Sequence, residues 1–100
     1  MTSTIYKYTL KSTGEVQTVN MPAGSAGVLG VGVQAQDFVI WVLITDKDKE
    51  GTVDRRFRIL LTGDDFDLGA YGPGFLRHVG SAQFVAGYRY IVGHVFEVSP

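Results

Sequence analysis

The chain is a succession of short segments rich in β-branched and aromatic residues, separated by clusters of turn-forming residues. No segment shows the 3.6-residue spacing of apolar positions that an amphipathic helix requires. The strand-like segments are Thr4–Leu10, Val16–Met21, Val28–Ala35, Phe38–Thr45, Val53–Leu61, Arg77–Val85 and Tyr88–Val98. This pattern predicts an all-β fold: a single domain over residues 1–100, built as an antiparallel sandwich or a small barrel of about seven strands.

Two segments carry specific information about packing. Phe38–Thr45 reads FVIWVLIT and is apolar at both alternating positions, so it is predicted to be the most buried strand, with Trp41 in the core. In Val28–Ala35, Gly30 and Gly32 share one face. Two glycines on one face indicate close approach of a bulky group or a strongly bent strand.

The connections between segments predict three hairpins. Thr4–Leu10 and Val16–Met21 are separated by a short turn-forming stretch, so they are expected to pair with each other. Gln36-Asp37 is short enough to close a second hairpin, and Ala86-Gly87 is a suitable two-residue turn for the third.

Composition restricts the classes of partner and of chemistry. The formal net charge is −1, which gives no long-range field to hold nucleic acid or an acidic membrane. There is no cysteine, which excludes a disulfide framework, a thiolate nucleophile and cysteine-ligated zinc. The N-terminal stretch lacks the pattern of a signal peptide, and the longest apolar run is far too short to span a membrane. We therefore expect a cytoplasmic protein without a cofactor.

The stretch TGDDFDLGAYGPGF, residues 62–75, is long for a connection in a small domain, and such loops are often functional. Its three aspartates, Asp64, Asp65 and Asp67, lack the spacing and the glutamate of a calcium loop, so they predict an acidic turn at a strand end and no metal site. Tyr71 and Phe75, flanked by glycines, predict either a loop that contacts a ligand or partner, or a crossing that two aromatic residues pin to the core.

Arginines gather in the C-terminal half of the chain. They are Arg55, Arg56, Arg58, Arg77 and Arg89. If their strands are neighbours, Arg56, Arg58 and Arg77 could bind a phosphate or carboxylate through bidentate hydrogen bonds. The alternative is a set of cross-strand pairs with acids such as Asp54 and Glu97.

No catalytic signature is present. His78 and His94 do not have the spacing of a metal motif, and no nucleophile elbow occurs, so a non-enzymatic protein is expected. The last segment instead has a long, largely apolar face. Its members are Tyr88, Tyr90, Val92, His94, Phe96 and Val98. A face of this kind in a small, nearly uncharged domain predicts a homo-oligomer, most simply a dimer.

The stretches IYKYTL, IWVLITD, RRFRILLTGDD and HVGSAQFVAGYRYIVGHVFEV resemble a small domain family of unknown function found in bacteriophages and in bacteria that carry prophages. Members of that family read I-Y-K-Y-x-L near the start, then R-x-F-R-I-x-x-T-G, and F-H-V-F-E near the end. The matching positions are Tyr6, Tyr8, Trp41, Phe57, Arg58, Thr62, Gly63, Gly80, Gln83, His94, Phe96 and Glu97. The chain differs at Asp64, where the family often has histidine, and at Gly93, where it has a bulky residue.

The resemblance implies a phage origin and an accessory role, and it transfers no catalytic or binding residue. Two functions are compatible with it. The first is a phage-encoded protein that binds and neutralises a host protein or a small nucleotide-like defence signal. The second is a structural protein associated with the virion or its assembly.

Overall fold

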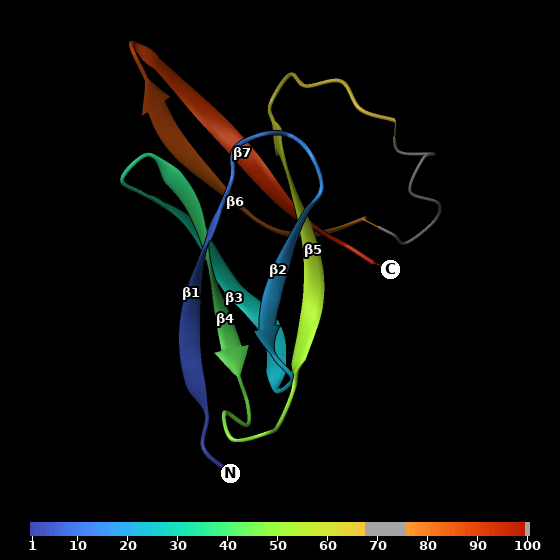
Figure 1. Ribbon diagram of the computed structural model, residues 1–100. Helices are drawn as coiled ribbons and strands as arrows, with labels where there is room; N and C mark the ends of the chain where they lie inside the picture. Colours follow the sequence, from blue (N-terminus) through green and yellow to red (C-terminus); the bar gives the residue numbers. More distant parts are fainter. Residues whose placement is uncertain (68–75, 100) are drawn as a thin grey trace.

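The computed structural model of the protein describes residues 1–67 and 76–99, and these form seven strands and no helix (Figure 1). The strands are β1 (Thr4–Leu10), β2 (Gln17–Pro22), β3 (Ser25–Gln34), β4 (Asp37–Ile44), β5 (Thr52–Leu61), β6 (Leu76–Ala86) and β7 (Arg89–Val98). Every strand pair is antiparallel. The predicted all-β fold is confirmed.

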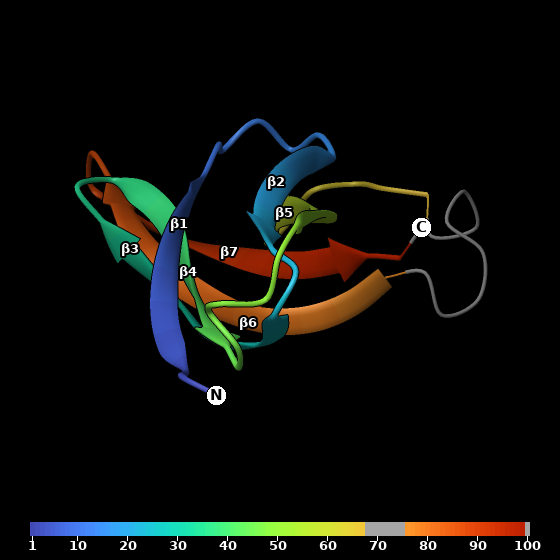
Figure 2. The same ribbon diagram turned by 60° about the horizontal axis from the view of Figure 1, so that its bottom comes forward.

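The strands form two sheets that face each other (Figure 2). The three-stranded sheet has the order β1-β4-β3, and the four-stranded sheet has the order β2-β5-β7-β6. The described strands of one sheet form no ladder with those of the other, so the fold is a sandwich and not a closed barrel.

The predicted hairpin between the first two strands is wrong. β1 pairs with β4 and β2 pairs with β5, so the connection between β1 and β2 crosses from one sheet to the other. The Gln17 carboxamide stabilises this crossing, because it accepts from the Lys11 amide at 2.8 Å and donates to the Lys11 carbonyl at 2.7 Å. The apolar sequence of β4 explains the pairing. A strand that is apolar on both faces is favoured at the centre of a sheet, and β4 takes β1 and β3 as its two neighbours.

The other two hairpins are confirmed, each with its turn displaced by one residue. β3 and β4 are joined at Ala35 and Gln36, which have φ values of 49° and 71°. β6 and β7 are joined at Gly87 and Tyr88, with Ala86 opposite Arg89. Gly87 has φ of 63° and is the first central residue of the turn, the position at which glycine is favoured in a type II′ turn.

One hydrophobic core lies between the sheets. The inward side chains of β4 meet those of β5 and β7, and Leu10 of β1 and Met21 of β2 join them. The fully buried members are Leu10, Met21, Phe38, Ile40, Val42, Ile44, Phe57, Ile59 and Val95. Two glycines permit close packing here, because a Cβ at Gly80 would overlap Val31 and a Cβ at Gly93 would overlap the ring of Phe38.

Trp41 is not in this core, contrary to the prediction. It is half-buried on the outer face of the three-stranded sheet, because alternation along β4 turns Phe38, Ile40 and Val42 inward. Its ring lies over Gly32, where a Cβ would come within 2.9 Å of two ring atoms. The interpretation of Gly32 as a place of close approach is therefore correct, whereas Gly30 faces open space.

Candidate functional site

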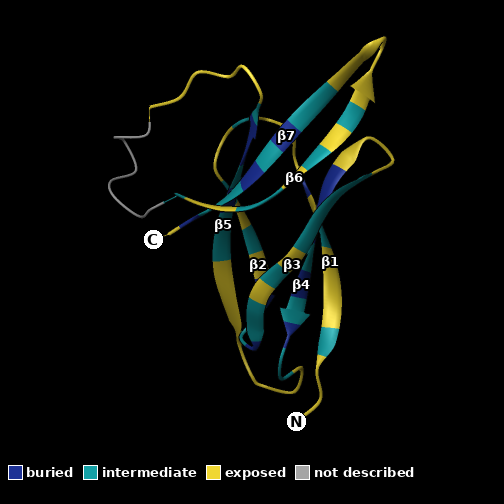
Figure 3. Ribbon diagram, turned by 180° about the vertical axis from the view of Figure 1, so that it is seen from behind, coloured by how far each residue is buried: buried dark blue, intermediate teal, exposed yellow. Residues whose placement is uncertain are grey.

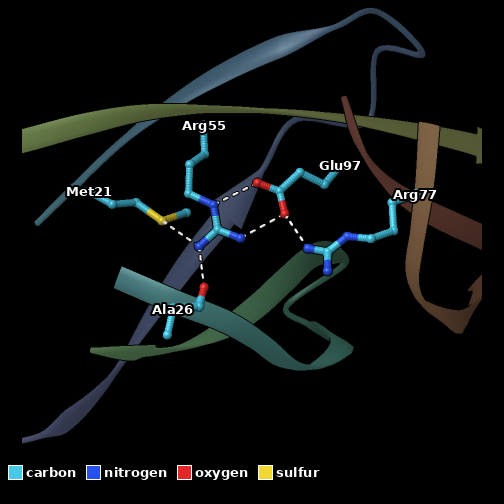
Figure 4. Close-up of polar contacts among 5 residues, drawn as sticks. All are labelled: Met21, Ala26, Arg55, Arg77 and Glu97. Atoms are coloured by element: carbon cyan, nitrogen blue, oxygen red, sulfur yellow. Dashed lines mark hydrogen bonds and ion pairs between the residues drawn. The ribbon is translucent and has the colours of Figure 1, made fainter. Parts of the chain in front are cut away.

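The arginines of β5 and β6 do not form a single patch. Arg55 lies on the inner face of the four-stranded sheet, where its Nε and Nη2 donate to the two carboxylate oxygens of Glu97 at 2.6 and 2.7 Å (Figure 4). Its Nη1 donates to the carbonyl of Ala26 in the opposite sheet. Arg77 reaches the same carboxylate from β6, with Nη2 to Oε1 at 2.7 Å. This cluster joins three strands of one sheet to the edge of the other.

The cluster holds Glu97 in its charged form. The hydrogen bonds from Arg55 are the main reason that the pKa of Glu97 lies below its usual value, and Arg77 adds to the effect. Burial of the carboxyl acts in the opposite direction, but the two guanidinium groups outweigh it. Of the two predicted acidic partners, Glu97 is confirmed, whereas the Asp54 carboxylate accepts from Asn20 Nδ2 at 2.8 Å.

Arg56 and Arg58 share the outer face of the same sheet, as the alternation predicts. Arg77 lies on the inner face, because it is opposite Glu97. Arg56 donates to the carbonyl of Ser99 at 2.7 Å, and Arg58 Nε donates to the carbonyl of Gly14 at 2.7 Å. Both side chains are half-buried. Their guanidinium groups thus hold the C-terminal residues and the β1–β2 crossing.

The outer face of the four-stranded sheet carries a second group of polar and aromatic side chains, separate from the Arg55–Glu97–Arg77 cluster. The register of β5, β7 and β6 places Arg58, Phe96 and His78 in one row across the sheet. Because directly opposed residues in antiparallel strands point to the same side, these side chains are neighbours. The next row contains His94 on β7 and Ser81 on β6.

Four side chains of this face form a continuous hydrogen-bonded chain. Ser81 Oγ lies 2.9 Å from His78 Nε2 and 2.8 Å from His94 Nδ1. The other ring nitrogen of His94, Nε2, lies 2.8 Å from Thr62 Oγ1 at the end of β5. We call His78, Ser81, His94 and Thr62 the polar chain. One hydroxyl is shared by two imidazoles, so the groups fix one another's orientation.

Aromatic contacts complete the surface around the polar chain. The rings of His78 and Phe96 meet edge to face with centroids 5.4 Å apart, and the rings of His78 and His94 are 6.3 Å apart. His78, Ser81 and Thr62 are exposed, whereas His94 and Phe96 are half-buried. The arrangement offers hydrogen-bonding groups and ring edges held on rigid strands, which is the requirement for specific recognition.

The sequence positions of His78 and His94 gave no indication of the polar chain. The missing information was the position of the β6–β7 turn. With Gly87 as the first central turn residue, Ala86 is opposite Arg89. Counting back along β6 and forward along β7 from that pair then places Ser81 opposite His94, as the structure has it. With the turn one residue earlier, a different residue would oppose His94. The bulge between His78 and Gly80 then brings His78 to the same face, and no sequence signal marked it.

The remaining predicted residues fall into two groups. Tyr71 and Phe75 lie outside the described residues. Asp64 lies just after β5 and closes the turn there, because its Oδ2 accepts from the Leu61 amide at 2.9 Å and its own amide donates to the Leu61 carbonyl at 2.9 Å. Within residues 1–67 and 76–99, no group of three or more histidine, aspartate or glutamate side chains is placed to hold a metal ion.

Comparison with known protein families shows to which family the chain belongs. The model of a family described as Domain of unknown function (DUF7352) matches residues 1–100. The chain belongs to the DUF7352 family. The description of that family agrees with the expected relationship to a family of unknown function. No curated protein and no solved structure matches the chain. The face described above is thus the candidate site of a DUF7352 domain.

None of the residues that the structure describes forms a helix long and apolar enough to cross a membrane.

Proposed function

We propose that this DUF7352 domain is a phage-encoded, non-enzymatic accessory protein that acts in the host cytoplasm. It binds a host protein through the outer face of its four-stranded sheet and so neutralises that protein. The observation that supports this proposal best is the polar chain, in which Ser81 Oγ joins His78 and His94 on an exposed sheet face.

The composition of the face suits a protein partner. Protein interfaces combine aromatic anchors with hydrogen-bonding groups, and they do not need a deep cavity. Here Phe96 and His78 supply ring surface, Ser81 and Thr62 supply hydroxyls, and all four lie on strands or at a strand end. Side chains that are already fixed by mutual hydrogen bonds lose little conformational entropy when they bind.

The same geometry favours a protein over a small nucleotide-like anion. A phosphate ligand requires guanidinium groups that converge on it. Arg55 and Arg77 instead converge on Glu97, whereas Arg56 and Arg58 donate to backbone carbonyls on the other face.

Affinity purification from an extract of the host tests the proposal. The immobilised protein is compared with Ser81→Ala and with His78→Asp, which change exposed groups and leave the inner face intact. We expect one host protein to be retained by the wild type and lost with both variants, while the melting temperature changes by less than about 5 °C, as is usual for exposed substitutions.

Lys7→Ala is the matched control, because Lys7 lies on the outer face of the other sheet and its Nζ donates to Gln34 at 2.8 Å. If the two test variants retained the host protein and Lys7→Ala lost it, the binding surface would lie on the three-stranded sheet and the proposal would be refuted. A thermal-shift screen with cyclic and linear nucleotides tests the small-ligand alternative, because a ligand that binds the folded form raises the melting temperature.

A role in the virion or its assembly is the second candidate. It is favoured by the edge at the start of β7, where none of the described strands lies on the β5 side of Arg89–Ile91, since open edges promote association between copies. Mass spectrometry of purified virions distinguishes the two functions: detection of the protein in stoichiometric amounts supports the structural role.

A further inference from the structure

The end of β5 extends past the start of its neighbour β2, because their pairing begins with Gln17 opposite Phe57 whereas β5 runs on to Leu61. The β1–β2 crossing passes beside this end of β5, and Gly14, with φ of 74°, turns the chain there. Arg58 Nε donates to the Gly14 carbonyl at 2.7 Å, so the crossing stays close to β5. In Figure 3 the crossing is mostly exposed, whereas the end of β5 is mostly buried.

The backbone groups of Ile59 point to the side of β5 on which the crossing lies. The Thr62 amide donates to the Val92 carbonyl of β7 at 3.0 Å, and backbone groups of alternate residues point to the same side of a strand. The amides and carbonyls of Ile59 and Leu61 therefore point away from β7. Both groups of Leu61 are bonded to Asp64, so Ile59 provides the next backbone donor and acceptor on that side.

The amide and carbonyl of Ile59 have no hydrogen-bond partner within residues 1–67 and 76–99. Glu15 would lie opposite Ile59 if β2 continued, but the Glu15 amide contacts Thr13 Oγ1 at 3.3 Å instead. Ile59 is 2% exposed. Because buried backbone groups are almost always paired, an adjacent donor and acceptor that are both unpaired indicate a place where a ligand can bind.

A pocket of about 240 Å³ lies between this edge of β5 and the crossing, and we call it the edge pocket. It is lined by Ser12, Thr13, Gly14, Ile59, Leu61 and Asp64. Its volume lies below the roughly 300–1,000 Å³ of pockets that hold drug-sized ligands, so it suits a single ring system. Of the described residues that line it, Asp64 alone is charged. Asp64 Oδ2 accepts from the Leu61 amide, and Oδ1 makes no hydrogen bond with a described residue.

The hydrogen-bonding groups of the edge pocket have a fixed order along β5. The Ile59 amide is a donor, the Ile59 carbonyl beside it is an acceptor, and the Asp64 carboxylate, held at the next amide on the same side, is a second acceptor. A matching ligand must present an acceptor, a donor and a second donor along one edge. Guanine has this order in its ring carbonyl, its ring N–H and its 2-amino group, and pterins carry the same edge.

The second donor separates this edge from those of the other common bases. Uracil, adenine and cytosine can each match the two groups of Ile59, since each has an acceptor beside a donor. None of them offers a second donor along the same edge: uracil has a carbonyl oxygen there, and the second amino hydrogen of adenine and of cytosine points away. Proteins select single bases through hydrogen bonds to this edge, so the Asp64 carboxylate favours the guanine type.

We infer that the edge pocket binds the lactam and amino edge of a guanine or pterin ring. The Ile59 amide donates to the ring carbonyl, the Ile59 carbonyl accepts from the ring N–H, and Asp64 Oδ1 accepts from the amino group. Ile59 acts through its backbone, so Asp64 is the side chain that determines specificity. Neither arginine nor lysine is among the described lining residues, so the inference concerns the ring and not the phosphates of a nucleotide.

Titration of ¹⁵N-labelled protein with nucleosides tests the inference through the amide resonances. Guanosine at up to about 1 mM should shift the Ile59 amide resonance in a saturable way, since weak ligands bind in that range. Inosine lacks the 2-amino group and should bind at least roughly tenfold more weakly, because a hydrogen bond to a charged group is lost. A pterin titrated in the same way distinguishes the two sources: binding of the pterin alone supports the inference and assigns the ligand to that class.

Asp64→Asn tests the role of the carboxylate. The variant keeps an oxygen for the Leu61 amide but replaces the second acceptor with a donor, so it should lose the preference for guanosine over inosine. Continued binding of inosine shows that the pocket is intact. Asp54→Asn is the matched control, because Asp54 is an exposed aspartate of the same strand that bonds to Asn20, and it should keep the preference.

Three results overturn the inference. The first is an Ile59 amide that neither guanosine nor the pterin shifts at about 1 mM. The second is equal binding of guanosine and inosine by the wild type, a comparison that needs no variant. The third is an undiminished preference for guanosine in Asp64→Asn. The edge pocket shares no residue with the polar chain, so this inference and the proposed binding of a host protein can fail independently.

Discussion

The ring of Phe38 on β4 fills the space that a side chain at position 93 on β7 would occupy. Phe38 also meets Phe84 on β6 edge to face, with ring centroids 5.4 Å apart. Gly93 is buried among these groups, so the absence of a side chain there is a condition for the packing of the two sheets.

Gly93→Ala should therefore lower the free energy of unfolding by about 1–3 kcal/mol, the usual cost of an overpacked core. Gly30→Ala is the matched control, because a Cβ at Gly30 meets nothing within 4 Å, and its effect should be far smaller. Adding Phe38→Leu to Gly93→Ala should recover part of the loss. Denaturant unfolding of the wild type, Gly93→Ala, Phe38→Leu and the double variant measures the coupling. Equal effects of the two glycine substitutions would refute the packing argument.

Trp41, the one tryptophan of the chain, reports on the outer face of the three-stranded sheet. Gly32→Ala places a methyl group within 2.9 Å of the ring atoms, so the ring must move outward. We expect a red shift of the fluorescence emission in folded Gly32→Ala protein, and no shift in Gly30→Ala. Because the ring is half-buried, Trp41→Ala should cost less than the roughly 3–5 kcal/mol typical of a core tryptophan.

Glu97 should make stability depend on pH in the acid range. Its pKa is lower in the folded protein than the usual 4.5, so its contribution is fully present above that value and is lost as the pH falls through the folded-state pKa. Glu97→Gln should destabilise the protein at pH 7 by about 3 kcal/mol, because it leaves Arg55 without its charge partner. The variant should also lose less stability than the wild type between pH 5 and pH 3.

Urea unfolding at several pH values measures this difference. Asp54→Asn serves as the control, since Asp54 is exposed and bonds to a neutral amide. If Glu97→Gln and the wild type lost stability in parallel on acidification, Glu97 would not be the group responsible.

The polar chain should respond as a unit to one substitution. Ser81→Ala removes a hydroxyl that contacts both imidazoles, so the ring nitrogen resonances of His78 and His94 should shift together. Thr62→Val should act mainly on His94. Long-range ¹H–¹⁵N correlation spectra at fixed pH measure these shifts. Stability should change by no more than about 1 kcal/mol because Ser81 is exposed. A shift confined to one histidine in Ser81→Ala would show that the chain is not continuous in solution.

The sequence alone was sufficient for the strands and for the alternation within them. β-branched and aromatic residues between turn formers predicted all seven segments, and alternation along β5 correctly separated Arg55 from Arg56 and Arg58. These properties are local, because side-chain direction in a strand has a period of two residues. The same rule predicted the shared face of Tyr90, Val92, His94 and Phe96.

Only the tertiary structure decided which strands are neighbours. β1 and β2 are adjacent in sequence, but β1 pairs with β4 in one sheet and β2 pairs with β5 in the other. Likewise, a one-residue change in the turn at Gly87 changes every cross-strand partner in β6 and β7, so Ser81 could be assigned to His94 only once the register was known. The candidate site depends on the pairing of strands, and pairing is set by packing between segments that are distant in sequence.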